Sequence, residues 1–88
     1  MIHNLKINSC YFEHVINKEK AFEIRKNDRN FQVGDYIYLN EWNNEKGTYT
    51  GRKVKGKIIY ITDYEQKDNY VVFGFDFIEY IVLHTVKG

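Results

Sequence analysis

The stretch YVVFGFDF, residues 70–77, has the clearest period-two pattern in the chain. Every second residue from Val71 to Phe77 is apolar. Because side chains of an extended chain project alternately to opposite sides, this pattern predicts a strand with one face against a core. A short last strand is expected to follow through Ile81 and Leu83. The protein therefore builds its core mainly on a sheet.

The rest of the chain supplies more strands and one main helix. The other expected strands span residues 3–7, 21–26, 36–42 and 49–61. Apolar residues at helical spacing predict a helix over 9–17, directly after the first strand. Gly51 and Gly56 are candidate positions for a bulge or bend. We expect an α+β fold in which five to six mostly antiparallel strands curl into a small β-barrel.

Length and composition limit the architecture to one domain, residues 1–88. Hydrophobic residues make up 43% of the chain and aromatic residues 17%, enough for a core without disulfides or a metal. One cysteine cannot form an internal disulfide, and no export signal opens the chain, so a cytoplasmic location is expected. No apolar run approaches the roughly 20 residues that a membrane span needs. No cofactor or metal is expected, since one Cys and three His form no recognised ligand set.

Charge is unevenly placed along the chain. The formal net charge is +1, but residues 1–57 carry +4 and residues 58–88 carry −3. Such asymmetry permits a local anion-binding face on a nearly neutral protein, although ordinary solvated surfaces show similar patterns.

The charged strand KAFEIRKND, residues 20–28, is the first candidate site. Glu23 and Arg25 project from one face, about 7 Å apart along a strand, and Lys20 precedes them. A carboxylate beside cations, with the planar fork of an arginine, suits a polar and partly anionic ligand such as a nucleotide. The alternative is a solvated strand face whose ion pair contributes under about 1 kcal/mol.

Several separated motifs give this chain a family resemblance. In chain order the motifs are HNLKI at 3–7, KAFEIRKND at 20–28, FQVGD at 31–35 and YTGR at 49–52. With these motifs in this order, the chain resembles the DUF3850 family of small bacterial and phage proteins from residue 2 to 75. That family is similar to the ASCH group of the PUA-like superfamily. The resemblance implies a PUA-like barrel with a cleft beside the first helix that binds RNA or modified nucleosides.

The ASCH motif reads glycine, any, lysine, any, any, glutamate, any, arginine. Three of its four positions match this chain, at Lys20, Glu23 and Arg25, while Lys18 replaces the glycine. The left-handed turn that the glycine would make is expected to fall to Asn17, since asparagine tolerates that conformation.

Two alternatives to a binding module remain at this point. An amidohydrolase branch of the ASCH group acts on acetylated cytidine and pairs the motif lysine with a threonine, where this chain has Glu23. A nucleoside amidohydrolase-like enzyme would here use Lys20 and Glu23, but the alcohol nucleophile is missing, so no catalytic residue is assigned firmly. The second alternative is a phage or bacterial protein-interaction factor, in which the cleft would bind no ligand.

Three further residues complete the predicted ligand-binding set: His3, Lys26 and Arg52. His3 either joins the cleft as a donor or lies hydrogen-bonded at the edge of the core, because it shares the parity of Leu5. The expected partner is RNA or a nucleotide, with no membrane and no metal, and the chain is expected to be a monomer or weak homodimer.

Lys53, Lys55 and Lys57 form a period-two stripe that predicts a path for a phosphate backbone. Aromatic residues of the neighbouring strands are either stacking platforms for bases or core residues. The alternative for the lysines is an ordinary edge strand whose charges discourage sheet aggregation.

Overall fold

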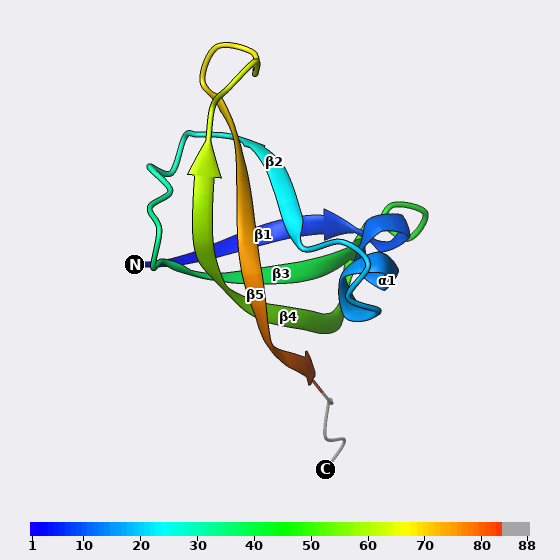
Figure 1. The fold of residues 1–88 in the computed structure, drawn as a ribbon. Coiled ribbons are helices and arrows are strands. Elements are labelled where there is room, and N and C mark those ends of the chain that lie inside the picture. Colours follow the sequence, from blue (N-terminus) through cyan, green and yellow to red (C-terminus); the bar gives the residue numbers. More distant parts are fainter. Residues whose placement is uncertain (84–88) are drawn as a thin grey trace.

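The computed structural model describes residues 1–83, which form five strands and one helix (Figure 1). The elements are β1 (Ile2–Asn8), α1 (Ser9–Ile16), β2 (Phe22–Lys26), β3 (Tyr36–Asn43), β4 (Thr48–Thr62) and β5 (Tyr70–Val82). The strand number falls within the predicted range, and the helix follows the first strand as expected.

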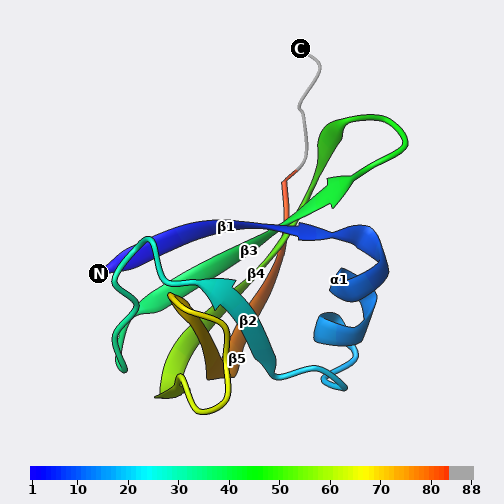
Figure 2. The ribbon, with the colours of Figure 1, turned by 90° about the horizontal axis from the view of Figure 1, so that it is seen from above.

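The five strands form one sheet in the order β1-β3-β4-β5-β2. β1 runs parallel to β3, and the other neighbouring pairs are antiparallel. The sheet curls so that its outermost strands, β1 and β2, turn toward each other, and α1 lies at one end between them (Figure 2). The predicted barrel is therefore an open half-barrel with two edges.

Alternating side chains fill the inside of the curl. The core residues are Leu5, Ile7, Phe12, Val15, Phe31, Ile37, Leu39, Val54, Ile58, Val71, Phe73 and Phe75. Most come from strands at period two, because every second side chain of a half-buried strand faces the core. Phe12 and Val15 are the buried residues of α1 and attach it to the sheet.

The expected separate last strand is wrong, because β5 runs unbroken from Tyr70 to Val82. The register with β4 shifts between Lys55 and Gly56, which confirms the predicted irregularity at Gly56. A Cβ there would lie 2.8 Å from Cδ2 of Phe75, so the bulge depends on a residue without a side chain. The extra residue at this shift is Ile78 of β5, because Gly56 pairs with Phe77 and Lys55 pairs with Glu79.

The left-handed residue after α1 is Lys18, with φ of 61°, and not Asn17, whose φ is −80°. The amide of Lys18 donates to the carbonyl of Val15 at 3.0 Å, and that of Glu19 donates to the carbonyl of His14 at 2.9 Å. These two bonds make a Schellman cap, whose left-handed position glycine usually occupies. Lys18 thus takes a left-handed conformation without being glycine.

Replacing Lys18 by glycine is expected to stabilise the fold by about 0.5–1 kcal/mol, because glycine relieves the left-handed strain at some cost in unfolded-chain entropy. Lys18→Ala is the control, since both variants lose the lysine ammonium that lies 5.3 Å from the Phe77 ring centroid. Urea unfolding should rank glycine above alanine by about 1 kcal/mol. Equal stability of the two variants would contradict a strained cap.

Candidate functional site

Lys20, Glu23 and Arg25 converge on one carboxylate. Oε2 of Glu23 accepts a hydrogen bond from Nζ of Lys20, and its Oε1 lies 3.1 Å from Nη2 of Arg25. The side chain of Glu23 is only 8% exposed, whereas those of Lys20 and Arg25 are 17% and 26% exposed. A surface ion pair on a solvated strand face does not describe this arrangement, because the shared carboxylate is buried.

The pairing of β2 with β5 sets the direction of these side chains. Glu23 stands opposite Phe73, and the alternation along β2 turns Phe22 and Ile24 to the outside, where they are 45% and 54% exposed. The predicted separation of the two faces is confirmed. The charged face of β2 points inward and the apolar face outward, the reverse of an ordinary half-buried strand.

Two arginine side chains, one on β2 and one in the segment after it, reach across to β1. Nη2 of Arg25 donates to the carbonyl of Lys6 at 2.7 Å, and Nη1 of Arg29 donates to the carbonyl of Asn4 at 2.9 Å. Both carbonyls belong to β1, the opposite edge of the sheet. The two cations thus satisfy backbone acceptors that an edge strand would otherwise present to water.

Two adjoining hollows lie beside the charged trio, and together we call them the β2 cleft. The first has a volume of about 380 Å³ and is lined by Tyr11, Lys20, Phe22, Glu23 and Ile24. The second, of about 260 Å³, is lined by Lys6, Ile7, Asn8, Tyr11, Glu23, Ile24 and Arg25. Aromatic and aliphatic walls around a few fixed charges are typical of small-ligand sites.

Tyr11 and Phe22 are the aromatic residues that line the first hollow, and neither is a specified residue of the motif. The ammonium of Lys20 lies 5.0 Å from the ring centroid of Phe22 and 5.9 Å from that of Tyr11. The sequence does not reveal that these two rings are exposed, because an aromatic residue in a strand or helix is more often part of the core.

His3 lies elsewhere, on the buried face of β1. Its Nε2 donates to Oδ2 of Asp35 at 2.7 Å, and its ring packs edge-on against Phe31 with centroids 4.7 Å apart. The hydrogen bond from His3 is the main cause of the lowered pKa of Asp35. This is the second predicted arrangement, a hydrogen-bonded residue at the edge of the core.

Lys26 lies next to the cleft. It lines a hollow of about 170 Å³ together with Arg25, Asp28 and Arg29, on the side of the arginine bridges. It therefore neighbours the trio without contacting Glu23.

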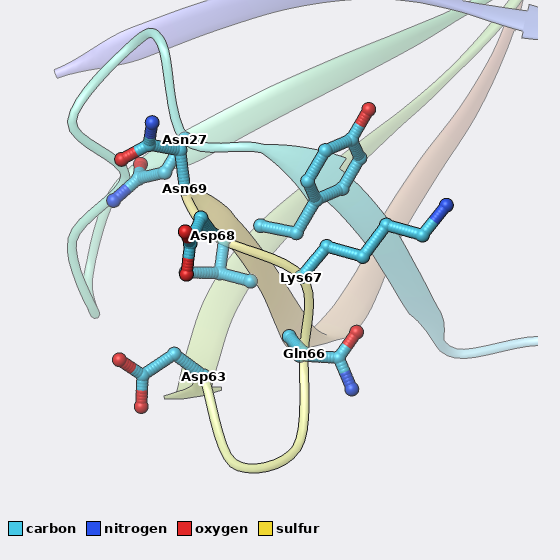
Figure 3. A pocket seen from close by; sticks show the side chains of 8 residues that line it. Asn27, Asp63, Gln66, Lys67, Asp68 and Asn69 are labelled. Atoms are coloured by element: carbon cyan, nitrogen blue, oxygen red, sulfur yellow. The ribbon is translucent and has the colours of Figure 1, made fainter.

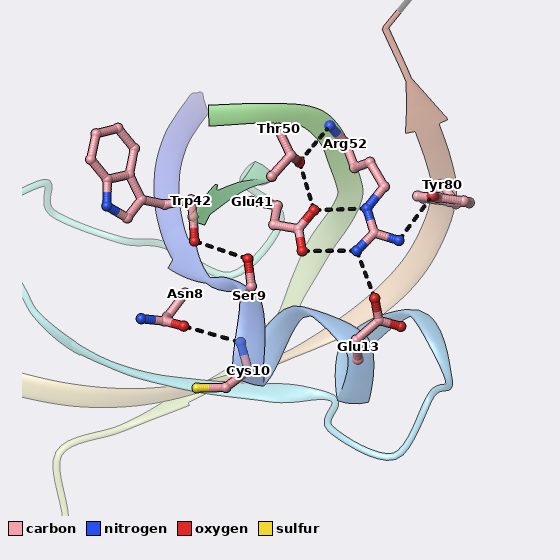
Figure 4. A network of polar contacts seen from close by, with 9 residues as sticks. All are labelled: Asn8, Ser9, Cys10, Glu13, Glu41, Trp42, Thr50, Arg52 and Tyr80. Atoms are coloured by element: carbon pink, nitrogen blue, oxygen red, sulfur yellow. Dashed lines mark hydrogen bonds and ion pairs between the residues drawn. The ribbon is translucent and has the colours of Figure 1, made fainter. Parts of the chain in front are cut away.

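Arg52 belongs to a different cluster, which joins α1, β3, β4 and β5 (Figure 4). Its Nε and Nη2 donate to the two oxygens of Glu41 at 2.7 and 2.8 Å, and Nη2 also donates to Glu13 at 2.6 Å. Thr50 donates to Glu41 at 2.6 Å. The bonds from Arg52 are the main cause of the lowered pKa of Glu41, and Glu41 in turn raises the pKa of Arg52. The sequence analysis missed Glu41, although it follows Ile37 and Leu39 at the same inward parity.

Lys53, Lys55 and Lys57 point away from the core, because Val54, Gly56 and Ile58 of the same strand are buried. β4 lies between β3 and β5, so the alternative of a lysine-rich edge strand is wrong. Sequence alone does not fix which strands lie at the edge of a sheet.

A further hollow lies at the turn between β4 and β5 (Figure 3). Its volume is about 280 Å³, and its polar lining comes from Asn27, Asp63, Gln66, Lys67, Asp68 and Asn69, with Tyr70 and Val71. Across residues 1–83, no three His, Cys, Asp or Glu side chains gather closely enough to hold a metal ion. Helices in this same part of the chain are too short or too polar to cross a bilayer.

Comparison with known proteins gives two matches. A family model described as a domain of unknown function, DUF3850, matches residues 2–75. An uncharacterized 12.9 kDa protein from the GpA 3′ region of Escherichia phage P2 is 38% identical over 88 residues, which cover 99% of this chain and 70% of the phage protein.

Proposed function

This chain belongs to the DUF3850 family, and we propose that it is a binding module that holds RNA or a nucleotide in the β2 cleft. The observation that supports this is the buried Glu23 carboxylate held between Lys20 and Arg25 beside an apolar hollow. Arg25 and Lys20 engage a phosphate or a base edge, and Glu23 orients both cations or accepts from a donor on the base. Tyr11 and Phe22 offer aromatic surface for the base.

We also propose that the half-barrel is an ASCH domain of the PUA-like type. The motif order from Lys20 to Arg25 supports this, together with the Schellman cap that keeps a left-handed residue at position 18.

The same contacts support binding over hydrolysis. The ammonium of Lys20 donates both to Glu23 and to the carbonyl of Phe22, the latter at 2.7 Å. An amine that activates a nucleophile needs a free lone pair, and Glu23 as a general base would have to leave two cations.

Arg25→Ala is expected to weaken binding of a short RNA or a nucleoside monophosphate at least tenfold at low salt. The variant removes one charged donor and one bridge to β1, so its folding is checked by circular dichroism. Lys67→Ala removes the same charge from the exposed turn before β5 and is the matched control.

Calorimetric titration of wild type and both variants across salt concentrations measures the effect. Wild type without affinity for either probe at low salt, or equal affinity in the Arg25 and Lys67 variants, would contradict the proposal. Release of acid from acetylated cytidine, abolished by Lys20→Ala, would instead establish the amidohydrolase alternative.

A further inference from the structure

The outward face of β1, β3 and β4 combines aromatic rings with lysines in register. Tyr38 stands opposite Asn4 on one side and Lys55 on the other. On one side of this row Tyr36 stands opposite Lys57, and on the other side Asn40 lies between Lys6 and Lys53. We call Lys6, Tyr36, Tyr38, Lys53, Lys55 and Lys57 the outer face.

The lysines of the outer face lie over its rings. The ammonium groups of Lys53 and Lys55 are 4.7 and 6.0 Å from the ring centroid of Tyr38. Those of Lys55 and Lys57 are 4.9 and 5.8 Å from that of Tyr36. Cation–π contacts of this kind hold the ammonium groups near the sheet without neutralising their charge.

These charges remain available to a ligand. None of the ion pairs found within residues 1–83 involves a lysine of the outer face. Asp76 and Glu79 stand opposite Lys57 and Lys55 on β5, so acidic side chains border the face on that side. A polyanion on this surface is therefore confined to β1, β3 and β4.

The spacing of the lysines suits a single strand of nucleic acid. Alternate residues on a strand are about 7 Å apart, comparable with successive phosphates of an extended single strand. Because β4 is an interior strand, protection of a sheet edge does not account for its three lysines. Tyr36 is exposed and Tyr38 is half-buried, and aromatic rings between cations are the usual elements of single-strand binding.

Lys6 connects the outer face to the β2 cleft. It lines the second hollow of the cleft, beside Glu23 and Arg25, and it also begins the row that leads to Lys53. Its ammonium lies 4.3 Å from the ring centroid of Trp42. Lys6 thus lies between the cleft and the lysines of β4, with Asn40 of β3 separating it from Lys53.

We infer that the ligand is a single-stranded nucleic acid several nucleotides long, with one nucleotide in the β2 cleft and the following phosphates along the outer face. This inference rests on the proposed function, and it distinguishes an oligonucleotide from a free nucleotide. It predicts that affinity rises with strand length.

The test compares two double variants of equal charge. Lys53→Gln with Lys55→Gln changes the outer face, and Lys46→Gln with Lys67→Gln changes two exposed turns. The probes are uridine monophosphate, labelled ten-nucleotide oligouridine RNA and the matching oligothymidine DNA, titrated by fluorescence anisotropy or calorimetry at several salt concentrations.

The outer-face variant should bind the oligonucleotide at least tenfold more weakly than wild type, and the slope of log affinity against log salt should fall by about 1.4 for two lost phosphate contacts. Binding of the mononucleotide should stay unchanged, and the control variant should match wild type. A preference between the RNA and DNA probes identifies which nucleic acid the protein takes.

The inference alone would be overturned if wild type bound the oligonucleotide no more tightly than the mononucleotide, or if the two double variants bound the oligonucleotide with equal affinity. Binding of poly-L-glutamate as tightly as the oligonucleotide would also overturn it, because charge alone would then suffice. Absence of binding to every nucleotide probe would remove the proposed function as well.

Discussion

Replacing Phe12 by alanine is expected to lower the free energy of unfolding by about 3–5 kcal/mol. The ring is fully buried, its centroid lies 6.4 Å from that of Tyr80, and the guanidinium carbon of Arg52 lies 5.1 Å above it. Truncation removes apolar contacts and leaves a cavity between α1 and the sheet. A domain of this size has a stability of roughly 4–13 kcal/mol, so the loss is a large fraction of the total.

Urea unfolding followed by circular dichroism measures the loss. Tyr11→Ala is the matched control, an aromatic residue on the same helix that is 55% exposed, and it should cost less than about 1 kcal/mol. If the alanine variant does not fold, Phe12→Leu should still fold with a smaller loss of about 1 kcal/mol. Equal losses at positions 11 and 12 would contradict the packing of α1 through Phe12.

Replacing Glu41 by alanine should cost about 3 kcal/mol at neutral pH, since breaking a buried ion pair leaves an uncompensated charge. Glu41 is 3% exposed and holds Arg52 by two hydrogen bonds. Arg52 keeps its contact with Glu13 in the variant, which limits the loss. Glu45→Ala, in the exposed turn after β3, should be nearly neutral in the same urea titration.

The same pair predicts how stability depends on pH. The folded state lowers the pKa of Glu41, so its stabilising contribution is fully present above the ordinary value of 4.5 and is lost as pH falls through the lowered folded value. Asp35 acts in the same direction relative to 3.8. Glu41→Gln should therefore be less stable than wild type at pH 7, with a shallower loss between about pH 5 and 3. Parallel pH curves would show that Glu41 does not titrate differently on folding.

Local pattern was sufficient to predict most elements. The alternation from Val71 to Phe77 and the helical spacing before residue 17 depend on side-chain period, which one sequence contains. The joining of the expected last strand to β5 was missed, because Asp76 and Glu79 resemble a break. Both residues are exposed, and β5 stays unbroken across the register shift that lies between them.

A single sequence does not predict which distant strands pair in the sheet. The interior place of β4 follows from its pairing with both β3 and β5, and no residue of β4 itself encodes it. The grouping of Lys20, Glu23 and Arg25 was predicted from the resemblance to a family motif. The inward direction of Glu23 and the bridge from Arg25 to the carbonyl of Lys6 depend on how the sheet curls.

The two edges of the half-barrel are joined by side-chain hydrogen bonds and not by backbone pairing, as they would be in a closed barrel. Parting the two strands breaks hydrogen bonds from Arg25 and Arg29 but leaves every backbone ladder intact. Each such bond contributes only about 1.5–3 kcal/mol, because water replaces it when it breaks. Separating the two edges therefore exchanges two side-chain hydrogen bonds for bonds to water and changes no strand pairing.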